Sequence, residues 1–423
     1  MQDNKPVLAG LEHSLPTRLL YVTTSDVSLI LLRGQLRFLR DAGFEVSAIS
    51  SPGRSLDAAS EAEGVQTHAV PMVREVGGLA DILSLWRLWR LMRRYRPVIT
   101  NVSTPKAGLL GGLASYLSGV PCRIYTLRGL RCETATGLKR WALLFAERVA
   151  CQCAHRVICV SESLRQKAVA LAVVDPGCAV VLGPGSSNGV DPDRFAPTVE
   201  LLGQAAPLRR ALGIPPDAPV IGFVGRFTRD KGVSELVQAF CQLHTEYPEL
   251  RLLLVGDFED GDPVSDQIRS MVASDPHIIF TGTVRDTAPY YHLMDILALP
   301  TYREGFPNAV IEAHAAAKPV VTTDATGAVD AVLDGITGIQ VPVRNAGALA
   351  EALAGLLANP QVADRMGLAG REHVMREFRQ EIIWMALEEE YLNLLRAKGM
   401  PLPQVRARQE LQALASSSGF APR

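Results

Sequence analysis

The feature that most constrains the fold is a series of short, mostly apolar runs that alternate with helix-length segments. In the first half of the chain the runs span residues 19–22, 46–49, 98–100, 123–126 and 157–160. In the second half they span residues 220–224, 252–255, 278–280, 296–299 and 320–322. They lack polar alternation, which is typical of parallel strands covered by helices on both faces. The sequence therefore predicts an α/β protein of two doubly wound, Rossmann-like domains that face a cleft.

Proline and glycine residues mark the boundary between the two halves. They are frequent in the stretch 189–217, and an apolar run follows this stretch directly. We expect an N-terminal domain over residues 17–200 and a C-terminal domain over residues 201–385. A helix over residues 386–398 closes the folded region and could pack back on the N-terminal domain. Residues 399–423 form a tail that we expect to be partly disordered.

The composition argues against several partners and sites. The formal net charge is -1 and no basic block occurs, so we expect no nucleic-acid partner. No apolar run reaches the roughly 18 residues of a membrane-spanning helix, and residues 1–20 lack the apolar core of a signal peptide. We expect a cytoplasmic protein, at most peripheral to the inner face of the membrane. The 7 cysteines are scattered, and Cys151 and Cys153 lack further ligands at zinc spacing, so we expect neither disulfides nor a metal site.

The loop after the run 220–224 carries two cations at the start of a predicted helix. It spans residues 225–232 and includes Arg226 and Lys231. Cations at the positive end of a helix dipole are unfavourable, by about 0.3–1 kcal/mol each, unless an anion joins them. A diphosphate would reverse this effect, because it accepts hydrogen bonds from helix amides and from both side chains. The alternative is a solvated turn in which Asp230 pairs with Arg229 and Lys231.

A second group of polar residues follows the run 296–299. Gly305 and Pro307 do not fit inside a helix, so Glu304 is predicted to lie on a loop. Asn308 is a good N-cap, which places Glu312 early in the next helix. Glu312 could then accept both hydroxyls of a ribose, and Glu304 could reach a sugar and its phosphate. The alternative is that Glu304 pairs with the arginine before it and that Glu312 only favours the helix start.

These two segments together resemble the retaining GT-B glycosyltransferases of the large family numbered four. The motifs are G-R-x4-K-G at residues 225–232 and Glu-x7-Glu at residues 304–312, and residues 188–191 resemble the family's interdomain connection. The resemblance covers roughly residues 18–396 and is more specific in the second half. It implies transfer of a sugar, with retention, from a nucleoside-diphosphate sugar, with UDP favoured and with no metal or other cofactor.

The resemblance also assigns residues to roles. It implies an acceptor-binding N-terminal domain and a donor-binding C-terminal domain. The implied catalytic residues are Glu304, Arg226 and Lys231. The implied donor-binding residues are Arg226, Lys231, Gly305, Phe306, Pro307, Asn308 and Glu312. Arg226 and Lys231 would hold the diphosphate, Glu312 the ribose, and Glu304 with the backbone of 305–308 the sugar.

The first half departs from the family pattern in two places. Many members carry a glycine pair after the first strand, where this chain has only Gly34. Many also carry a histidine after the strand that matches 123–126, where this chain has Arg128, which cannot act as a base. Members of bacterial polysaccharide, capsule and O-antigen assembly look most similar here, including the segment around Lys106. The acceptor residues are therefore predicted to be Lys106, Arg128 and Gly34, and the acceptor a growing surface glycan linked to a lipid diphosphate.

Other functions remain open on the same fold. A nucleotide-sugar epimerase would need no acceptor, a phosphorylase would need inorganic phosphate, and a nucleotide-sugar-binding protein would show no turnover. Residues 86–96 form a basic, amphipathic segment that could lie on an anionic membrane. We favour an ordinary covering helix there, with apolar residues inward and arginines outward. We likewise favour a solvated loop over a divalent-ion site for the acidic residues of 257–262.

Overall fold

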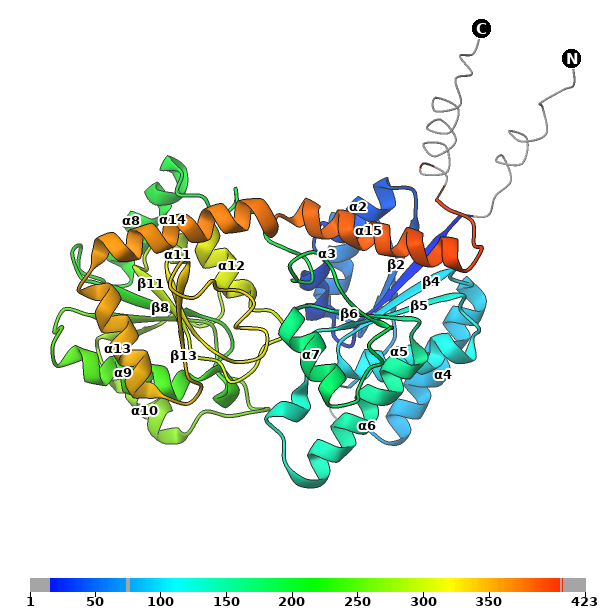
Figure 1. The fold of residues 1–423 in the computed structure, drawn as a ribbon, viewed down its shortest axis with the longest axis horizontal. Coiled ribbons are helices and arrows are strands. Elements are labelled where there is room, and N and C mark those ends of the chain that lie inside the picture. Colours follow the sequence, from blue (N-terminus) through cyan, green and yellow to red (C-terminus); the bar gives the residue numbers. More distant parts are fainter. Residues whose placement is uncertain (1–15, 74–76, 404, 406–423) are drawn as a thin grey trace, which may run out of the picture.

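Two α/β domains lie side by side in the computed structural model (Figure 1), which describes residues 16–73, 77–403 and 405. The first domain holds a sheet of seven parallel strands in the order β3-β2-β1-β4-β5-β6-β7. The second holds six parallel strands in the order β10-β9-β8-β11-β12-β13. Both orders are those of doubly wound folds, so the prediction of two Rossmann-like domains in a GT-B arrangement is confirmed.

The strands are short and their bounds are as follows. The first sheet contains β1 (Arg18–Val22), β2 (Glu45–Ser50), β3 (Gln66–Ala69), β4 (Ile99–Ser103), β5 (Cys122–Leu127), β6 (Arg156–Cys159) and β7 (Ala179–Val181). The second contains β8 (Val220–Val224), β9 (Arg251–Val255), β10 (Ile278–Phe280), β11 (Ile296–Leu299), β12 (Val320–Thr323) and β13 (Gly338–Val341). The apolar runs did not identify β3, β7 and β13, which are edge strands with half-exposed side chains.

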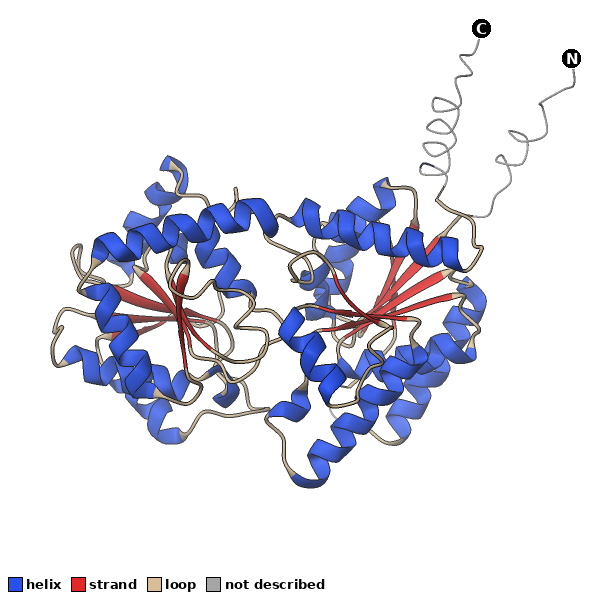
Figure 2. Ribbon diagram, viewed as in Figure 1, coloured by secondary structure: helices blue, strands red, loops and turns tan. Residues whose placement is uncertain are grey.

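Helices cover both sheets, as the colouring by secondary structure shows (Figure 2). The first domain has η1 (Asp26–Leu32), α2 (Gln35–Asp41), α3 (Arg54–Glu63), α4 (Leu79–Tyr95), α5 (Pro105–Leu117), η2 (Arg131–Glu133), α6 (Gly137–Cys153) and α7 (Glu162–Ala170). The second has α8 (Val199–Ala211), η3 (Arg229–Lys231), α9 (Val233–His244), α10 (Asp266–Ser274), α11 (Ala288–Tyr291), α12 (Asn308–Ala315), α13 (Ala346–Leu357) and α14 (Pro360–Glu377). The chain then continues into α15 (Gln380–Ala397).

Each face of the first sheet has its own hydrophobic core. Leu20 and Val22 of β1 point to the face covered by α4, α5, α6 and α7. Leu19 and Tyr21 point to the opposite face, because side chains alternate along a strand. That face is covered by α2, α3 and also by α15, whose Tyr391 is fully buried there. The last described helix therefore packs on the first domain and ties the two ends of the fold together.

The chain crosses between the domains twice, at adjacent points. Val190 already belongs to the core of the second domain, before α8 begins. Its N–H donates to the carbonyl of Phe378 at 2.8 Å, and its carbonyl accepts from Gln380 at 3.2 Å, so the two crossings are paired. The predicted tail lies mostly outside the described residues. No helix among the described residues is long and apolar enough to cross a membrane.

The expected orientation of residues 86–96 is wrong in one respect. The buried positions of α4 are Ser84, Leu88 and Met92. Trp86 and Trp89, which we expected to face inward, are exposed to solvent. The physical reason is the helical period: residues that follow the buried stripe at 84, 88 and 92 by one or two positions rotate away from the sheet.

Candidate active site

The strand order reverses between β8 and β11 in the second sheet and between β1 and β4 in the first. Ligands of doubly wound folds bind beyond the carboxyl ends of the strands at such points. The predicted donor residues all follow β8 or β11. Lys106 follows β4 and Arg128 follows β5, so the structure places these two at the corresponding edge of the first domain.

The loop after β8 depends on a glycine that touches the loop after β11. Gly232 has φ +71°, in the left-handed region, and separates η3 from α9. A Cβ at Gly232 would lie 1.9 Å from the carbonyl oxygen of Pro300. Only glycine therefore allows the two loops to approach this closely. Their contact brings Lys231 toward the Glu304 loop.

Lys231 and Glu304 form an ion pair between the two loops. The Nζ of Lys231 donates to Oε1 of Glu304, and the side chains are only 19% and 11% exposed. The alternative pairings considered from the sequence are not the ones formed. Asp230 pairs with Arg303, and Arg229 pairs with Asp262 at 3.3 Å. The two motifs therefore form one site.

Asp230 joins the two loops through an ion pair with Arg303. Burial alone would raise the pKa of its carboxyl, but the Arg303 guanidinium and the Thr228 hydroxyl outweigh burial and lower that pKa. Thr228 donates to the carboxylate at 2.7 Å. A buried, ionised Asp230 therefore holds the side chain of Arg303, the residue before Glu304.

Arg226 extends the site toward solvent. Its guanidinium is mostly exposed and pairs with Glu259 of the acidic loop. The same loop supplies Asp262, which pairs with Arg229 and also accepts from the N–H of Asp230 at 2.9 Å. These acidic residues thus brace the loop after β8. Among the described residues, no group of three His, Cys, Asp or Glu side chains is arranged to hold a metal ion.

Glu312 lies in α12, although the cap differs from the prediction. We expected Asn308 to be the N-cap, but α12 starts at Asn308 itself and Pro307 occupies the cap position. The reason is that the carbonyl of Pro307 accepts the first turn bond, from the N–H of Val310 at 3.1 Å. No side chain caps α12, and the N–H groups of its first two residues have no intrahelical acceptor, as at any helix start.

The carboxylate of Glu312 is held by two hydroxyls. Tyr291 donates to Oε2 at 2.8 Å and Thr287 donates at 3.5 Å. Burial raises the pKa of Glu312, and the Tyr291 hydrogen bond partly opposes this effect. The side chain therefore has a fixed orientation at the start of α12.

Arg128 is a half-buried cation at the facing edge of the first domain. Burial lowers its pKa to about 10, and the nearby phenols of Tyr21 and Tyr391 act in the opposite direction. It remains charged at neutral pH. Its Nε has no hydrogen-bond partner in the part of the chain that the structure describes. An anion that reached this point would satisfy the guanidinium.

The backbone at Arg128 contacts the predicted donor loop directly. A Cβ at Gly305 would lie 2.2 Å from the carbonyl oxygen of Arg128. Phe306, the next residue, packs against the cores of both domains. The two domains therefore meet at the predicted donor loop, and glycine at 305 permits this approach.

The other two predicted acceptor residues are already engaged. Lys106, at the start of α5, pairs with Asp81 of α4 at 2.7 Å. The N–H of Gly34 donates to Glu63 at 2.8 Å, and the ring of Trp384 from α15 covers it. The structure thus brings Arg128 to the second domain, while Gly34 lies beneath α15.

Some residues of this region were not identified from the sequence. Thr104, directly after β4, has φ +75°, which is uncommon for a residue other than glycine. Its Oγ1 lies 2.7 Å from that of Thr24 after β1. Across the domains, Glu133 accepts from Thr326 at 2.7 Å. Their position directly after strands was the available signal for Thr24 and Thr104.

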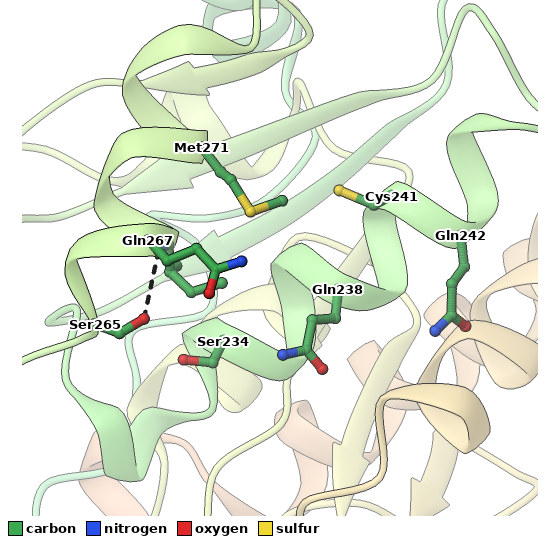
Figure 3. A pocket seen from close by; sticks show the side chains of 8 residues that line it. Ser234, Gln238, Cys241, Gln242, Ser265, Gln267 and Met271 are labelled. Atoms are coloured by element: carbon green, nitrogen blue, oxygen red, sulfur yellow. Dashed lines mark hydrogen bonds between the residues drawn. The ribbon is translucent and has the colours of Figure 1, made fainter.

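Two cavities lie in different places. One of about 350 Å³ lies between α9 and α10, and its lining carries no charge (Figure 3). A smaller one of about 170 Å³, here called the interdomain cavity, lies where the domains meet. It is lined by Glu133, Arg140, Lys167, Tyr302 and Arg344, among others. Of these two cavities, the interdomain cavity is the one that adjoins the predicted site.

Comparison with known families matches both domains. The family described as glycosyl transferases group 1 matches residues 218–359. The glycosyl transferase 4-like domain matches residues 32–185. The first match covers the Lys231 and Glu304 loops, and the second covers the Arg128 loop.

Similar proteins match long stretches of the chain, in two cases about nine tenths of it. The capsular polysaccharide biosynthesis glycosyltransferase CapM of Staphylococcus aureus is 35% identical over 379 residues, which cover 90% of this chain and 98% of that protein. The UDP-Gal:alpha-D-GlcNAc-diphosphoundecaprenol alpha-1,3-galactosyltransferase of Escherichia coli is 25% identical over 273 residues, or 63% of this chain and 68% of that protein. The structure of Anabaena Alr3699/HepE in complex with UDP and glucose has a TM-score of 0.75 at 19% identity, covering 89% of this chain and 100% of that one. This last likeness establishes the shared fold.

Proposed function

This chain belongs to the group 1 glycosyltransferases of the GT-B fold and is a glycosyltransferase of the polysaccharide-biosynthesis type, and we propose that it transfers a sugar from a UDP-sugar, with retention of configuration, to a glycan on a lipid diphosphate. The observation that carries the proposal is the Lys231–Glu304 pair at the strand reversal of the second sheet. A cation and a carboxylate held there suit a phosphate and a sugar hydroxyl of one donor. The names of the similar proteins favour UDP and a lipid-diphosphate acceptor.

The donor would be held by three parts of the second domain. Lys231 and Arg226 would exchange their carboxylate partners for the diphosphate, whose negative charge is greater. The open amides at the start of α12 would bind the same diphosphate. Glu312 would accept the ribose hydroxyls, and Glu304, released from Lys231, would accept a hydroxyl of the sugar. Gly305 to Asn308 supply the backbone beside that sugar.

The chemistry needs charge balance at the departing diphosphate. The C1–O bond to the phosphate breaks, and a C1–O bond to the acceptor hydroxyl forms on the same face of the sugar. The hydroxyl proton passes to the departing phosphate oxygen. Preorganised cations and amides are effective at this task because they need no reorganisation as charge develops. Arg226 and Lys231 would supply this charge, so we expect activity without a metal ion.

The acceptor would enter from the first domain. Arg128 is the group suited to the acceptor diphosphate, because the buried Nε of its guanidinium has no partner among the described residues. Lys106, which is paired with Asp81, would contact the acceptor at the same edge of the first domain. The nucleotide and the acceptor would then meet where Arg128 contacts Gly305.

The test begins with donor binding and ends with product. Thermal shift with UDP-, GDP- and other nucleotide sugars should give stabilisation by UDP-sugars. The stabilising sugar, mixed with a lipid-diphosphate-linked glycan and EDTA, should yield a product whose new linkage keeps the donor's anomeric configuration by NMR. Sugar isomerised without acceptor would identify an epimerase, a phosphate requirement would identify a phosphorylase, and binding without turnover would identify a non-catalytic protein. Loss of activity in EDTA would contradict the metal-independent site.

A further inference from the structure

Two helices of the first domain carry apolar side chains on their outer faces. On α4 these are Leu79, Ile82, Leu83 and Trp86, and on α6 they are Leu138, Trp141 and Phe145. Their exposed fractions run from 49% at Trp86 to 88% at Leu138. Trp141 and Phe145 stack with ring centroids 5.7 Å apart, so they form one apolar surface instead of two isolated side chains. Grouped apolar side chains of this kind mark an interaction site.

The two stripes belong to one side of the molecule. α4 and α6 both pack against α5, on the same face of the first sheet (Figure 1). We call the exposed surface of α4 and α6 the outer helical face. It reaches the active-site edge at both helices. Asp81 of α4 pairs with Lys106, and Arg140 of α6 lines the interdomain cavity.

The charge of the outer helical face is strongly positive. The basic residues of these two helices are all exposed; they are Arg87, Arg90, Arg93, Arg94, Lys139, Arg140 and Arg148. Their carboxylates are Asp81, which pairs with Lys106, and Glu147, which is buried and accepts from Tyr125. The whole chain has a formal net charge of -1, so this positive charge is local.

We propose that the outer helical face docks on an anionic lipid bilayer, with the side chains of Trp86, Trp141 and Phe145 at the level of the headgroups. Tryptophan suits the membrane interface because its ring is apolar and its N–H is polar. Arginines beside apolar residues are attracted by anionic lipid. The guanidinium of Arg90 lies 5.4 Å from the Trp86 ring, so charge and aromatic surface meet on α4.

The inference deepens the proposed function, since it rests on a lipid-linked acceptor for its purpose. Docking through the outer helical face would set the active-site edge next to the bilayer. A diphosphate at the bilayer surface would then need to travel only a short way to Lys106 and Arg128. The exposed apolar residues lie in the N-terminal halves of α4 and α6, up to the middle of each helix, and these halves are the ones nearest this edge.

A second copy of the chain is the competing occupant of the outer helical face. Two copies joined through it would bring the arginines of α4 close to like charges, which is unfavourable. An anionic bilayer has the complementary charge. We therefore commit to the bilayer, and self-association becomes one outcome of the test.

The test measures binding of the full chain to vesicles by co-sedimentation. Vesicles of phosphatidylglycerol and phosphatidylcholine, in equal parts, should bind the protein at least tenfold more tightly than phosphatidylcholine alone, and added salt should weaken this binding. Trp141→Glu should reduce binding at least tenfold, and Trp86→Glu should reduce it similarly. The matched control is Leu368→Glu, a 58% exposed residue of α14 in the second domain, which should bind as the original chain does.

The outcomes separate this inference from the proposed function. Thermal stabilisation by a UDP-sugar should be unchanged in Trp141→Glu, which shows that the variant is folded with an intact donor site. Equal binding to both vesicle types, or undiminished binding by Trp141→Glu, would overturn the inference. So would a dimer by light scattering that Trp141→Glu converts to a monomer. Vesicle binding without sugar transfer would refute the proposed function and leave the docking surface standing.

Discussion

Lys231 is bonded to Glu304, a residue 73 positions later in the chain, and this contact joins the loops that follow β8 and β11. Both side chains are largely shielded from water, so the pair is not a solvated surface contact. In the absence of ligand, each side chain neutralises the other. A diphosphate sugar offers both an anion for the lysine and a hydroxyl for the glutamate. Under the proposed function, Lys231 would bind the diphosphate and Glu304 a sugar hydroxyl of one donor.

The first prediction concerns both members of this pair. Lys231→Ala and Glu304→Gln should each lower kcat by at least about 100-fold, the usual cost of losing one group that stabilises developing charge. Steady-state kinetics with a verified UDP-sugar and acceptor measure this loss. Circular dichroism and thermal unfolding should show that both variants remain folded.

The matched control is Arg229→Ala. Arg229 lies two positions before Lys231 and is equally basic, but it pairs with Asp262 and is 62% exposed. Its removal should change kcat by less than about threefold, since an exposed ion pair is worth about 0–1 kcal/mol. Turnover by Lys231→Ala at the original rate, or an equal loss in Arg229→Ala, would refute the assignment.

The sequence predicted the parts of the fold that depend on local pattern. Buried strands such as β8 and β11 are continuous apolar runs, whereas the half-exposed edge strand β3 has no such pattern. The sequence singled out the loops after β8 and β11, but it did not predict how their side chains pair. Three basic residues, Arg226, Arg229 and Lys231, are near Asp230 in the sequence. In the folded chain Asp230 pairs instead with Arg303, which is distant in the sequence.

Long-range contacts were the least predictable part. The hydroxyl oxygen of Tyr391 in α15 lies 2.7 Å from that of Tyr21, a residue 370 positions earlier. No local pattern encodes this contact, because it depends on where α15 crosses back to the first domain. For the same reason, the sequence could not predict that Arg128 lies near several tyrosines or that Trp384 covers Gly34.

The second prediction concerns the pH dependence of donor binding. Burial raises the pKa of Glu312, so this carboxyl takes up its proton at a higher pH than an ordinary glutamate. The protonated form loses an acceptor for the ribose hydroxyls. The affinity for a UDP-sugar, whose diphosphate does not titrate near neutral pH, should therefore be constant at high pH. It should fall on acidification through the raised pKa, by up to about tenfold per pH unit below it. Calorimetric titration with the UDP-sugar between pH 5 and pH 8 measures the fall.

Glu312→Gln supplies the control for this dependence. Glutamine keeps the shape but does not titrate, so the UDP-sugar should bind more weakly than to the original chain and with a flat pH profile over the same range. The raised pKa also means that the folded state holds the proton more tightly than the unfolded chain, so this group should contribute more stability on acidification. A pH profile in the variant identical to the original would exclude Glu312 as the titrating group.

The third prediction concerns Arg128. Arg128→Met keeps much of the side-chain volume but removes the charge and the donors, so kcat/KM for a lipid-diphosphate acceptor should fall by about 10–100-fold. Arg128→Lys keeps the charge without the planar guanidinium and should recover only part of the loss. The KM of the acceptor should rise, while UDP binding by calorimetry stays unchanged. Equal weakening of donor and acceptor would instead place Arg128 at the diphosphate of the donor.

The fourth prediction concerns the glycine that brings the two donor loops together. Gly232→Ala must place a Cβ in a left-handed backbone, which costs about 1–2 kcal/mol. The same Cβ also meets the carbonyl oxygen of Pro300 at 1.9 Å, and such overpacking adds about 1–3 kcal/mol. Gly213→Ala is the matched control, because Gly213 has nearly the same φ, +67°, with nothing within 4 Å of its added Cβ. Denaturant unfolding should therefore show a larger loss of stability for Gly232→Ala, and UDP affinity should fall only in that variant, because Lys231 shifts away from Glu304. An equal loss in the two variants would mean that the Gly232–Pro300 contact does not position the donor loops.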